Sequence, residues 1–206
     1  MSTEDEIRSA STKFYAGLNR MTQGDASQLA DIWSHSDTVT TLHPIGGEQI
    51  GWTEVKESFD QVAGLASSGH VELAGQTIQS GGELAYEVGI ERGSFTLSGE
   101  SIAIEQRVTN IYRRENGEWK IVHHHTDLSP AMLGVLERLQ RAAEAAGAAS
   151  RARSHGHSRT RPPALIERAA AFHSFRRRLT EVRRAGRARA RLTRAGTAPA
   201  CCRPGL

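Results

Sequence analysis

The sequence predicts an α+β domain in which helices come first and an antiparallel sheet follows. Apolar residues recur at helical intervals up to about residue 65, and β-prone runs separated by short glycine-containing turns occupy about 71–126. Strands joined by such short connections pair antiparallel, and helices before a run of strands are typical of the α+β class. The strongest local signal is Asn116-Gly117 between two β-prone runs, because both residues tolerate the positive φ of a two-residue hairpin turn.

Three helices are expected before the four long strands. The first covers about residues 4–22 and has Thr3 and Glu6 at the spacing of a capping box. Asp25 is expected to cap a short second helix, and Thr53 to cap a third helix with one apolar face.

The strands follow in a regular order along the chain. A short strand at 39–42 enters a turn that begins with His43. Ser129-Pro130 suits the N-cap and first turn of a closing helix that ends near Ala146. Between them, four longer strands are expected at 71–79, 84–94, 101–113 and 119–126.

The 206 residues suffice for one domain and an extension, and their charge is unevenly distributed. Residues 1–150 hold 11 Lys and Arg against 21 Asp and Glu, a net charge of −10, whereas residues 151–206 hold 15 Arg, no Lys and 2 acids, a net charge of +13. We predict a folded domain at 1–130, a C-terminal helix at 131–147 and an Arg/Ala-rich tail at 148–206. The tail is expected to be disordered, because it has few large apolar residues from which to build a core.

The cysteines and the N-terminus indicate the cellular compartment in which the protein is expected. Cys201 and Cys202 both lie in the tail, so no disulfide framework supports the domain. The acidic N-terminus lacks the apolar core of a signal peptide, and no stretch reaches the ~20 apolar residues of a membrane-spanning helix. We therefore expect a cytoplasmic protein, and no residue pattern predicts a cofactor.

The arginines of the tail allow three interpretations. Clustered Arg binds nucleic-acid phosphates in a salt-dependent way, but only Phe172 and Phe175 are available to stack on bases. A basic amphipathic helix can instead lie on an anionic membrane. Arg without Lys, together with Ala, Gly and Pro, is also the composition that GC-rich DNA yields when it is read past or out of its natural frame, and we favour such an accidental extension over either binding role.

Two regions carry a resemblance to a known superfamily. The segment Gly117-Glu118-Trp119-Lys120-Ile121-Val122-His123-His124-His125 is similar to the end of the association (hub) domain of calcium/calmodulin-dependent kinase II, and to the C-terminal signature of the SnoaL-like and nuclear-transport-factor-2-like superfamily. The segment Leu42-His43-Pro44-Ile45-Gly46-Gly47-Glu48, followed by Gly51 and a helix, resembles ketosteroid isomerases, as does Phe14-Tyr15-Ala16-Gly17-Leu18-Asn19. The resemblance covers about residues 5–130.

This resemblance implies a cone, in which the N-terminal helices pack in the concavity of a strongly curved antiparallel sheet with a pocket between them. Homodimers are common in the superfamily, and a homodimer is expected here. One fold hosts many activities, so function is implied less closely. We expect a pocket for a small hydrophobic or polyketide-like molecule, in an isomerase, cyclase, dehydratase or hydrolase. The alternative is a non-catalytic ligand-binding or oligomerisation module.

The resemblance assigns a candidate base. His43 stands where ketosteroid isomerases have their aspartate general base, and a histidine with a pKa near ~6.5 can accept a proton near neutrality. The alternative role, which we favour, is a turn histidine held by hydrogen bonds at the pocket mouth. Phe14 matches the isomerase's oxyanion tyrosine, with Tyr15 about 100° further round the helix, and no carboxylate matches its second acid. Steroid isomerisation is therefore not expected.

The three histidines of the last strand do not share a face. His124 is expected to point opposite to His123 and His125, which share their face with Trp119 and Ile121. Matching to the two relatives places the pocket on the even-numbered face, and the odd-numbered face toward a dimer partner or outer packing. A β-bulge in the strand at 101–113 would reverse this inference for part of its length. The residues expected to contact the substrate are Tyr15, Trp33, Trp52, Asn110, Tyr112, His124 and Thr126.

Two further groups are candidate ligand sites. His123 and His125 project together, but zinc needs three or four ligands and no cysteine lies nearby, so we predict no metal site. Arg107 is expected to form an ion pair rather than to bind a ligand carboxylate. Its candidate partners are Glu87, Glu91 and Glu105.

Overall fold

The computed structural model of the chain describes residues 2–153. Its helices are α1 (Thr3–Met21), the short 3₁₀ helix η1 (Ser27–Asp31), α2 (Trp52–Leu65) and α3 (Pro130–Arg153). Because α3 runs on to Arg153, the first six residues of the predicted tail are helical. The predictions for the tail beyond Arg153 lie outside the described residues.

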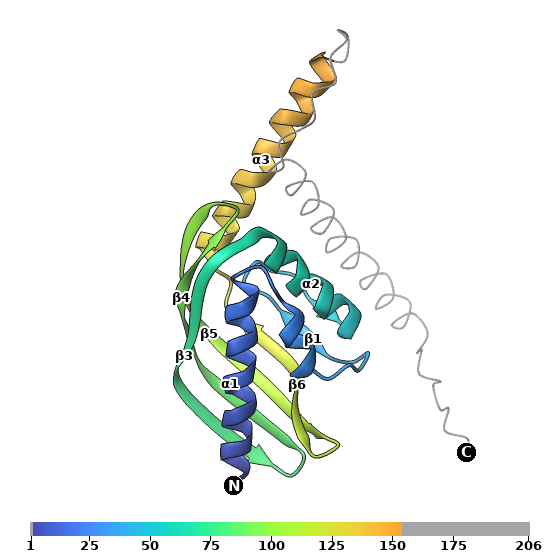
Figure 1. Ribbon diagram of the computed structural model, residues 1–206, viewed down its shortest axis with the longest axis vertical. Helices are drawn as coiled ribbons and strands as arrows, with labels where there is room; N and C mark the ends of the chain where they lie inside the picture. The colour runs from blue at the N-terminus through green and yellow to red at the C-terminus, as the bar shows by residue number, and fades with distance from the viewer. Residues whose placement is uncertain (1, 154–206) are drawn as a thin grey trace, which may run out of the picture. The chain divides into compact units, whose positions relative to one another are not determined.

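One six-stranded sheet follows the order β2-β1-β6-β5-β4-β3. The four long strands form an antiparallel meander, whereas β1 pairs with β6 in parallel and with β2 antiparallel. Figure 1 shows α1 lying across the curved sheet, with α2 beside it over β1. The sheet has two free edges, β2 and β3, so it does not close, and the predicted α+β architecture is confirmed. The strands are β1 (Thr40–Leu42), β2 (Gln49–Ile50), β3 (Ala66–Gly81), β4 (Leu84–Leu97), β5 (Glu100–Glu115) and β6 (Glu118–Thr126).

The bend between β3 and β4 depends on two glycines that face the opposite strand at close range. A Cβ at Gly93 would lie 2.0 Å from the carbonyl oxygen of His70, and a Cβ at Gly69 would lie 2.1 Å from the Cβ of Phe95. The register of this pair also shifts between Ala66 and Ser68. Such close backbone approach is available only to glycine, and it lets the sheet curve around the helices.

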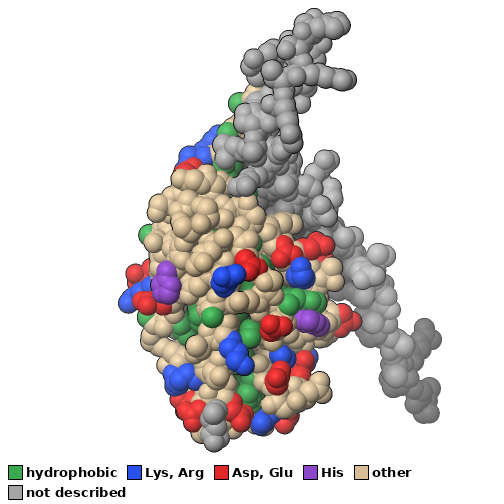
Figure 2. Space-filling model, viewed as in Figure 1, with side chains coloured by type: hydrophobic (Ala, Val, Ile, Leu, Met, Phe, Trp, Pro, Cys, Tyr) green, Lys and Arg blue, Asp and Glu red, His purple; other side chains and the backbone are tan. Residues whose placement is uncertain are grey.

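The interior lies between the helices and the concave face of the sheet. Large side chains there are completely or almost completely buried, which removes their apolar surface from water. Acidic and basic side chains are interspersed over the face of the domain seen in Figure 2. Among residues 2–153, no helix is long and apolar enough to cross a membrane. The most deeply buried large side chains include Ile7, Phe14, Leu29, Trp33, Leu97, Tyr112 and Ile121.

Three of the predicted helix caps are wrong by one or two residues. Ser2, not Thr3, is the N-cap of α1, and its side chain forms a reciprocal capping box with Asp5. Gly51, not Thr53, precedes α2, and its positive φ of 86° makes the abrupt turn into that helix. Asp25 accepts a hydrogen bond from the backbone amide of Ser27 at the start of η1, but the N-cap residue of this helix is Ala26 rather than the predicted Asp25. Neighbouring candidate caps are hard to separate from sequence, because several satisfy the same spacing rule.

The capping box makes a direct prediction. Replacing Ser2 with alanine should lower the free energy of unfolding by about 1 kcal/mol, because the backbone amide of Asp5 loses its acceptor. Urea denaturation followed by circular dichroism measures this change. Thr3→Ala is the matched control and should alter stability by only a few tenths of a kcal/mol. Equal losses in the two variants would contradict the assignment of the cap.

Candidate functional site

A small cavity lies between α1, α2 and the concave face of the sheet. Its volume is about 60 Å³, and its wall is mostly apolar. Half-buried Pro44, Ile45 and Val62 border it, so it opens at this rim. An apolar cavity with a few inward polar groups is the usual form of a small-molecule site. The polar side chains in its wall are Thr22, His43, Glu91, Gln106 and His124.

Glu91 of β4 is a buried carboxyl on the cavity wall. Its side chain accepts hydrogen bonds from the Tyr15 hydroxyl at 3.2 Å and from Gln106 Nε2 at 2.9 Å. No Lys or Arg pairs with it within residues 2–153. Burial therefore dominates and raises the pKa of Glu91 to about 7. A carboxyl with this pKa can both give and take a proton at neutral pH.

His43 lies directly after β1 and is also buried. Its Nε2 is 2.7 Å from the Ser58 hydroxyl, which donates to the carbonyl oxygen of Val55 at 2.6 Å. Because a hydroxyl has one hydrogen and a carbonyl can only accept, both bonds form only when His43 donates from Nε2. Nδ1 is then the unprotonated nitrogen. Burial lowers the pKa of His43 to about 4, so the ring is neutral at pH 7.

His124 of β6 lies on the concave face, with its ring against Phe14 at 5.3 Å between centroids. Its Nδ1 is 2.7 Å from Asn110 Oδ1, and Asn110 Nδ2 donates to Glu87 Oε1 at 2.7 Å. The amide nitrogen of Asn110 faces the carboxylate, so its oxygen accepts from His124 Nδ1–H and leaves Nε2 unprotonated. Burial, and then the repulsion that protonated His124 would meet from protonated His43, lower the pKa of His124 well below its ordinary value.

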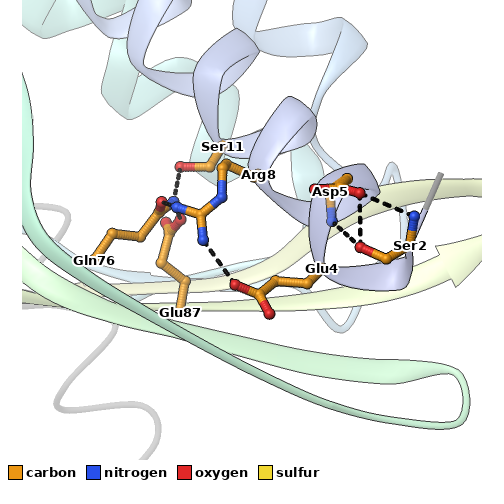
Figure 3. A network of polar contacts seen from close by, with 7 residues as sticks. All are labelled: Ser2, Glu4, Asp5, Arg8, Ser11, Gln76 and Glu87. Carbon is orange, nitrogen blue, oxygen red and sulfur yellow. Dashed lines mark hydrogen bonds and ion pairs between the residues drawn. The ribbon is translucent and has the colours of Figure 1, made fainter.

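Glu87 is fully buried and anchors this series of hydrogen bonds. Besides Asn110 it accepts from the Tyr112 hydroxyl at 3.1 Å and from Gln76 Nε2 at 2.6 Å. Gln76 in turn accepts a hydrogen bond from Arg8 of α1, and Figure 3 shows this part of the network between the helix and the sheet. The series therefore runs from the surface of α1 through Glu87 and Asn110 to the cavity histidine.

A β-bulge changes the predicted parity of β6. Ile111 lies opposite His123, but the next residue of β5, Tyr112, lies opposite Ile121, so Val122 is an extra residue. The side chains of Trp119 and Ile121 are consequently buried, like that of His124, rather than sharing the face of His123 and His125. The prediction that these four odd-numbered residues share one face is wrong, and the bulge is in β6 rather than in the preceding strand.

The structure separates the predicted substrate-contacting residues. His43 and His124 border the cavity. Asn110 and Tyr112 do not border it but belong to the hydrogen-bond network of His124. Tyr15 likewise does not border it and donates a hydrogen bond to Glu91. Thr126 is buried on the same face of β6.

The two tryptophans lie away from the cavity wall. Trp33 packs on Phe59 at 5.8 Å, and Trp52 stacks on His35 at 4.6 Å between ring centroids. Neither residue borders the cavity. They fill space next to the site rather than forming its surface.

The ion pair expected for Arg107 exists, but with a different partner. Arg107 binds Asp127 at 2.8 Å on the surface, and Glu105 pairs with Arg92. Glu87 and Glu91 face the interior instead. His123 Nδ1 contacts the Thr40 hydroxyl at 2.6 Å, and no group of three or more His, Cys, Asp or Glu suited to a metal occurs within residues 2–153.

Thr22, Glu91 and Gln106 are the polar cavity groups that the sequence did not predict. In β4, Leu84 and Tyr86 lie on one face of the strand and Glu87 on the other. This pattern predicts that the apolar face with Leu84 and Tyr86 points into the interior. The structure has the opposite arrangement: Leu84 is 52% exposed, Tyr86 is 46% exposed, and the glutamates are buried. In this reversed arrangement the two glutamates lie opposite polar residues of β5, Gln106 and Asn110. Only that pairing of polar residues across the β4–β5 pair could have indicated the site.

Solved structures of similar fold come from several bacteria. A proposed dehydratase of the nuclear transport factor 2-like family from Streptomyces avermitilis is 22% identical, with a TM-score of 0.54, over 62% of this chain and 96% of that one. A proposed calcium/calmodulin-dependent kinase II association domain from Xanthomonas campestris is 16% identical, with a TM-score of 0.52, over 63% and 90% of the two chains. At these identities the likeness concerns the fold alone.

The family assignment comes from the sequence of the domain as a whole. No curated protein matches the chain. The family model of the SnoaL-like domain matches residues 7–132, which include most of α1, the entire sheet and the beginning of α3. This range contains every residue of the cavity wall. The chain belongs to the SnoaL-like domain family.

Proposed function

We propose that the domain binds a small, mainly apolar molecule in this cavity and transfers a proton to or from it. The reaction would be an isomerisation, cyclisation, dehydration or hydrolysis assisted by a general base. The observation that carries the proposal is the buried carboxyl of Glu91 at an apolar cavity wall, because this burial raises its pKa to about 7. Its ionised form accepts a proton, and its protonated form returns one.

His43 is the second candidate for the base. Its Nδ1 carries a free lone pair in a neutral ring, which suits it to accept a proton. With a pKa of about 4, however, it holds a proton at neutral pH far less readily than Glu91 does. The two roles therefore differ in their pH dependence.

A general-base probe tests the proposal. The base-promoted ring opening of nitrobenzisoxazole breaks a C–H and an N–O bond and releases a coloured nitrophenolate, so absorbance reports the rate. We expect a rate above that of buffer that rises with pH around a midpoint near 7, and a loss of about a hundredfold in Glu91→Gln.

The control is Glu72→Gln, the same change at an exposed position of β3, which should leave the rate unaltered. A rate that is flat above pH 5 and is lost in His43→Asn would transfer the role of base to His43. A wild-type rate equal to that of Glu91→Gln at every pH would contradict a catalytic role for Glu91.

The alternative function is non-catalytic ligand binding. The small cavity volume of about 60 Å³ favours this alternative, because it has room for a few water molecules or for one end of a larger molecule. A molecule bound this way would place its polar end in the cavity and its remainder on the rim. Binding without any base-catalysed rate would support the alternative.

We also propose that the domain forms a homodimer through the outer face of the sheet. The exposed apolar side chains of Leu84 and Tyr86 point away from the interior on β4, where water contact is unfavourable. Light scattering coupled to size-exclusion chromatography measures the mass directly. A monomer that persists at high protein concentration would contradict this proposal.

A further inference from the structure

We infer that the cavity selects neutral molecules that donate hydrogen bonds, such as alcohols and phenols, over ethers and carboxylates of the same shape. The inference rests on the proposed small-molecule site and adds the chemical class of its ligand. It follows from which polar atoms of the wall are already used by the protein and which are left for a ligand.

The two histidines each present an acceptor. His43 donates from Nε2 to Ser58, and His124 donates from Nδ1 to Asn110. Each neutral ring has one N–H and one lone pair, so His43 Nδ1 and His124 Nε2 are acceptors. Among residues 2–153 neither of these nitrogens has a hydrogen-bond partner, and both rings border the cavity.

Gln106 supplies a third acceptor. Its Nε2 donates to Glu91 at 2.9 Å, and this bond orients the amide. Its Oε1 is buried and has no partner within the described part of the chain. A buried carbonyl oxygen without a hydrogen bond is unfavourable, so a ligand whose donor reaches this oxygen removes that cost.

The charges of the wall act against anions. None of the cavity-lining residues is a Lys or Arg. The pKa values of His43 and His124 are both lowered by burial, so their rings carry no positive charge at pH 7. Glu91 is increasingly negative above its pKa of about 7. A carboxylate would therefore lose its hydration without gaining a cationic partner.

Three probes of one ring size test the class: phenol, anisole and benzoate. Each is titrated into the full-length protein at pH 8, where Glu91 is largely ionised, and binding is read from the ring-proton shifts of His43 and His124. Phenol should bind about tenfold more tightly than anisole, because only phenol donates a hydrogen bond, and benzoate should bind most weakly.

A variant and a tautomer measurement connect the preference to these atoms. Gln106→Met keeps the length of the side chain but removes the acceptor, so the advantage of phenol over anisole should fall about fivefold; the exposed Gln79→Met is the control. In the wild type, nitrogen–proton correlation spectra should show His43 protonated at Nε2 and His124 at Nδ1. This second measurement does not depend on any variant folding.

The outcomes are distinct. Anisole or benzoate binding as tightly as phenol, or either histidine having the opposite tautomer, would overturn the inferred ligand class while leaving the site itself in place. Shifts with none of the probes would overturn the inference as well. The nitrobenzisoxazole rate of wild type against Glu91→Gln then decides separately whether the proposed function fails with it.

Discussion

Replacing Gly93 with alanine is expected to destabilise the domain by more than about 4 kcal/mol or to prevent folding. The new Cβ would lie 2.0 Å from the His70 carbonyl oxygen and 3.0 Å from the Cα of Val71, both backbone atoms of the paired strand. Relief would require β3 and β4 to separate where the sheet bends. Because this bend shapes the concave face that carries Glu91, loss of pairing here would also open the cavity.

The matched control is Gly64→Ala in α2, where no heavy atom lies within 4 Å of the new Cβ. That change should be neutral or stabilising by up to about 1 kcal/mol, because alanine favours the helix over glycine. Urea unfolding monitored by circular dichroism compares both variants with the wild type. A loss below about 1 kcal/mol in Gly93→Ala would contradict the idea that backbone contact at this bend requires glycine.

The second large effect is expected from Glu91→Gln as a function of pH. The folded state raises the pKa of Glu91 from its ordinary 4.5 to about 7, so folding favours the protonated carboxyl. This contribution is fully present below about pH 4.5 and is lost as the pH rises through 7. Glutamine resembles the protonated form at every pH. The stability of the variant relative to wild type should therefore increase by about 3 kcal/mol from pH 4.5 to 8.

The difference in stability between Glu91→Gln and the wild type does not contain the contributions of the buried histidines, because both proteins have them. The pKa values of His43 and His124 are lowered, so both variant and wild type lose stability as the pH falls below the ordinary histidine value. Denaturation midpoints at several pH values, combined with the carbon-13 titration of the Glu91 carboxyl, measure the effect. A stability difference that does not change with pH would show that Glu91 ionises normally in the folded protein. Glu72→Gln should follow the wild type throughout.

Much of the architecture is predictable because it depends on local chemistry. The Asn116-Gly117 turn requires positive φ, which Asn116 has at 51° and Gly117 at 85°, and it therefore occurs where expected. Helical periodicity likewise predicted α1 to within one residue at each end. The short connections between strands gave the antiparallel meander of β3 to β6.

The candidate site was predictable only in part. His43 and His124 were identified through the resemblance, and both border the cavity. Glu91 was considered only as an ion-pair partner of Arg107, because a carboxylate in a strand is ordinarily solvated or paired. Its burial depends on the bend of β4 and on Tyr15 and Gln106, which are 76 and 15 residues away along the chain.

The kinds of elements, their order and the sharp turns are therefore predictable from local sequence, since they follow from φ preferences and from the spacing of apolar residues within a few positions. Which face of each strand is interior depends instead on contacts between distant parts of the chain. The extra residue Val122 reverses the alternation within β6, and the apolar outer side of β4 inverts the usual pattern. Both result from how distant strands and α1 share one concave surface, and the pKa of Glu91 follows from that burial rather than from its neighbours in the chain.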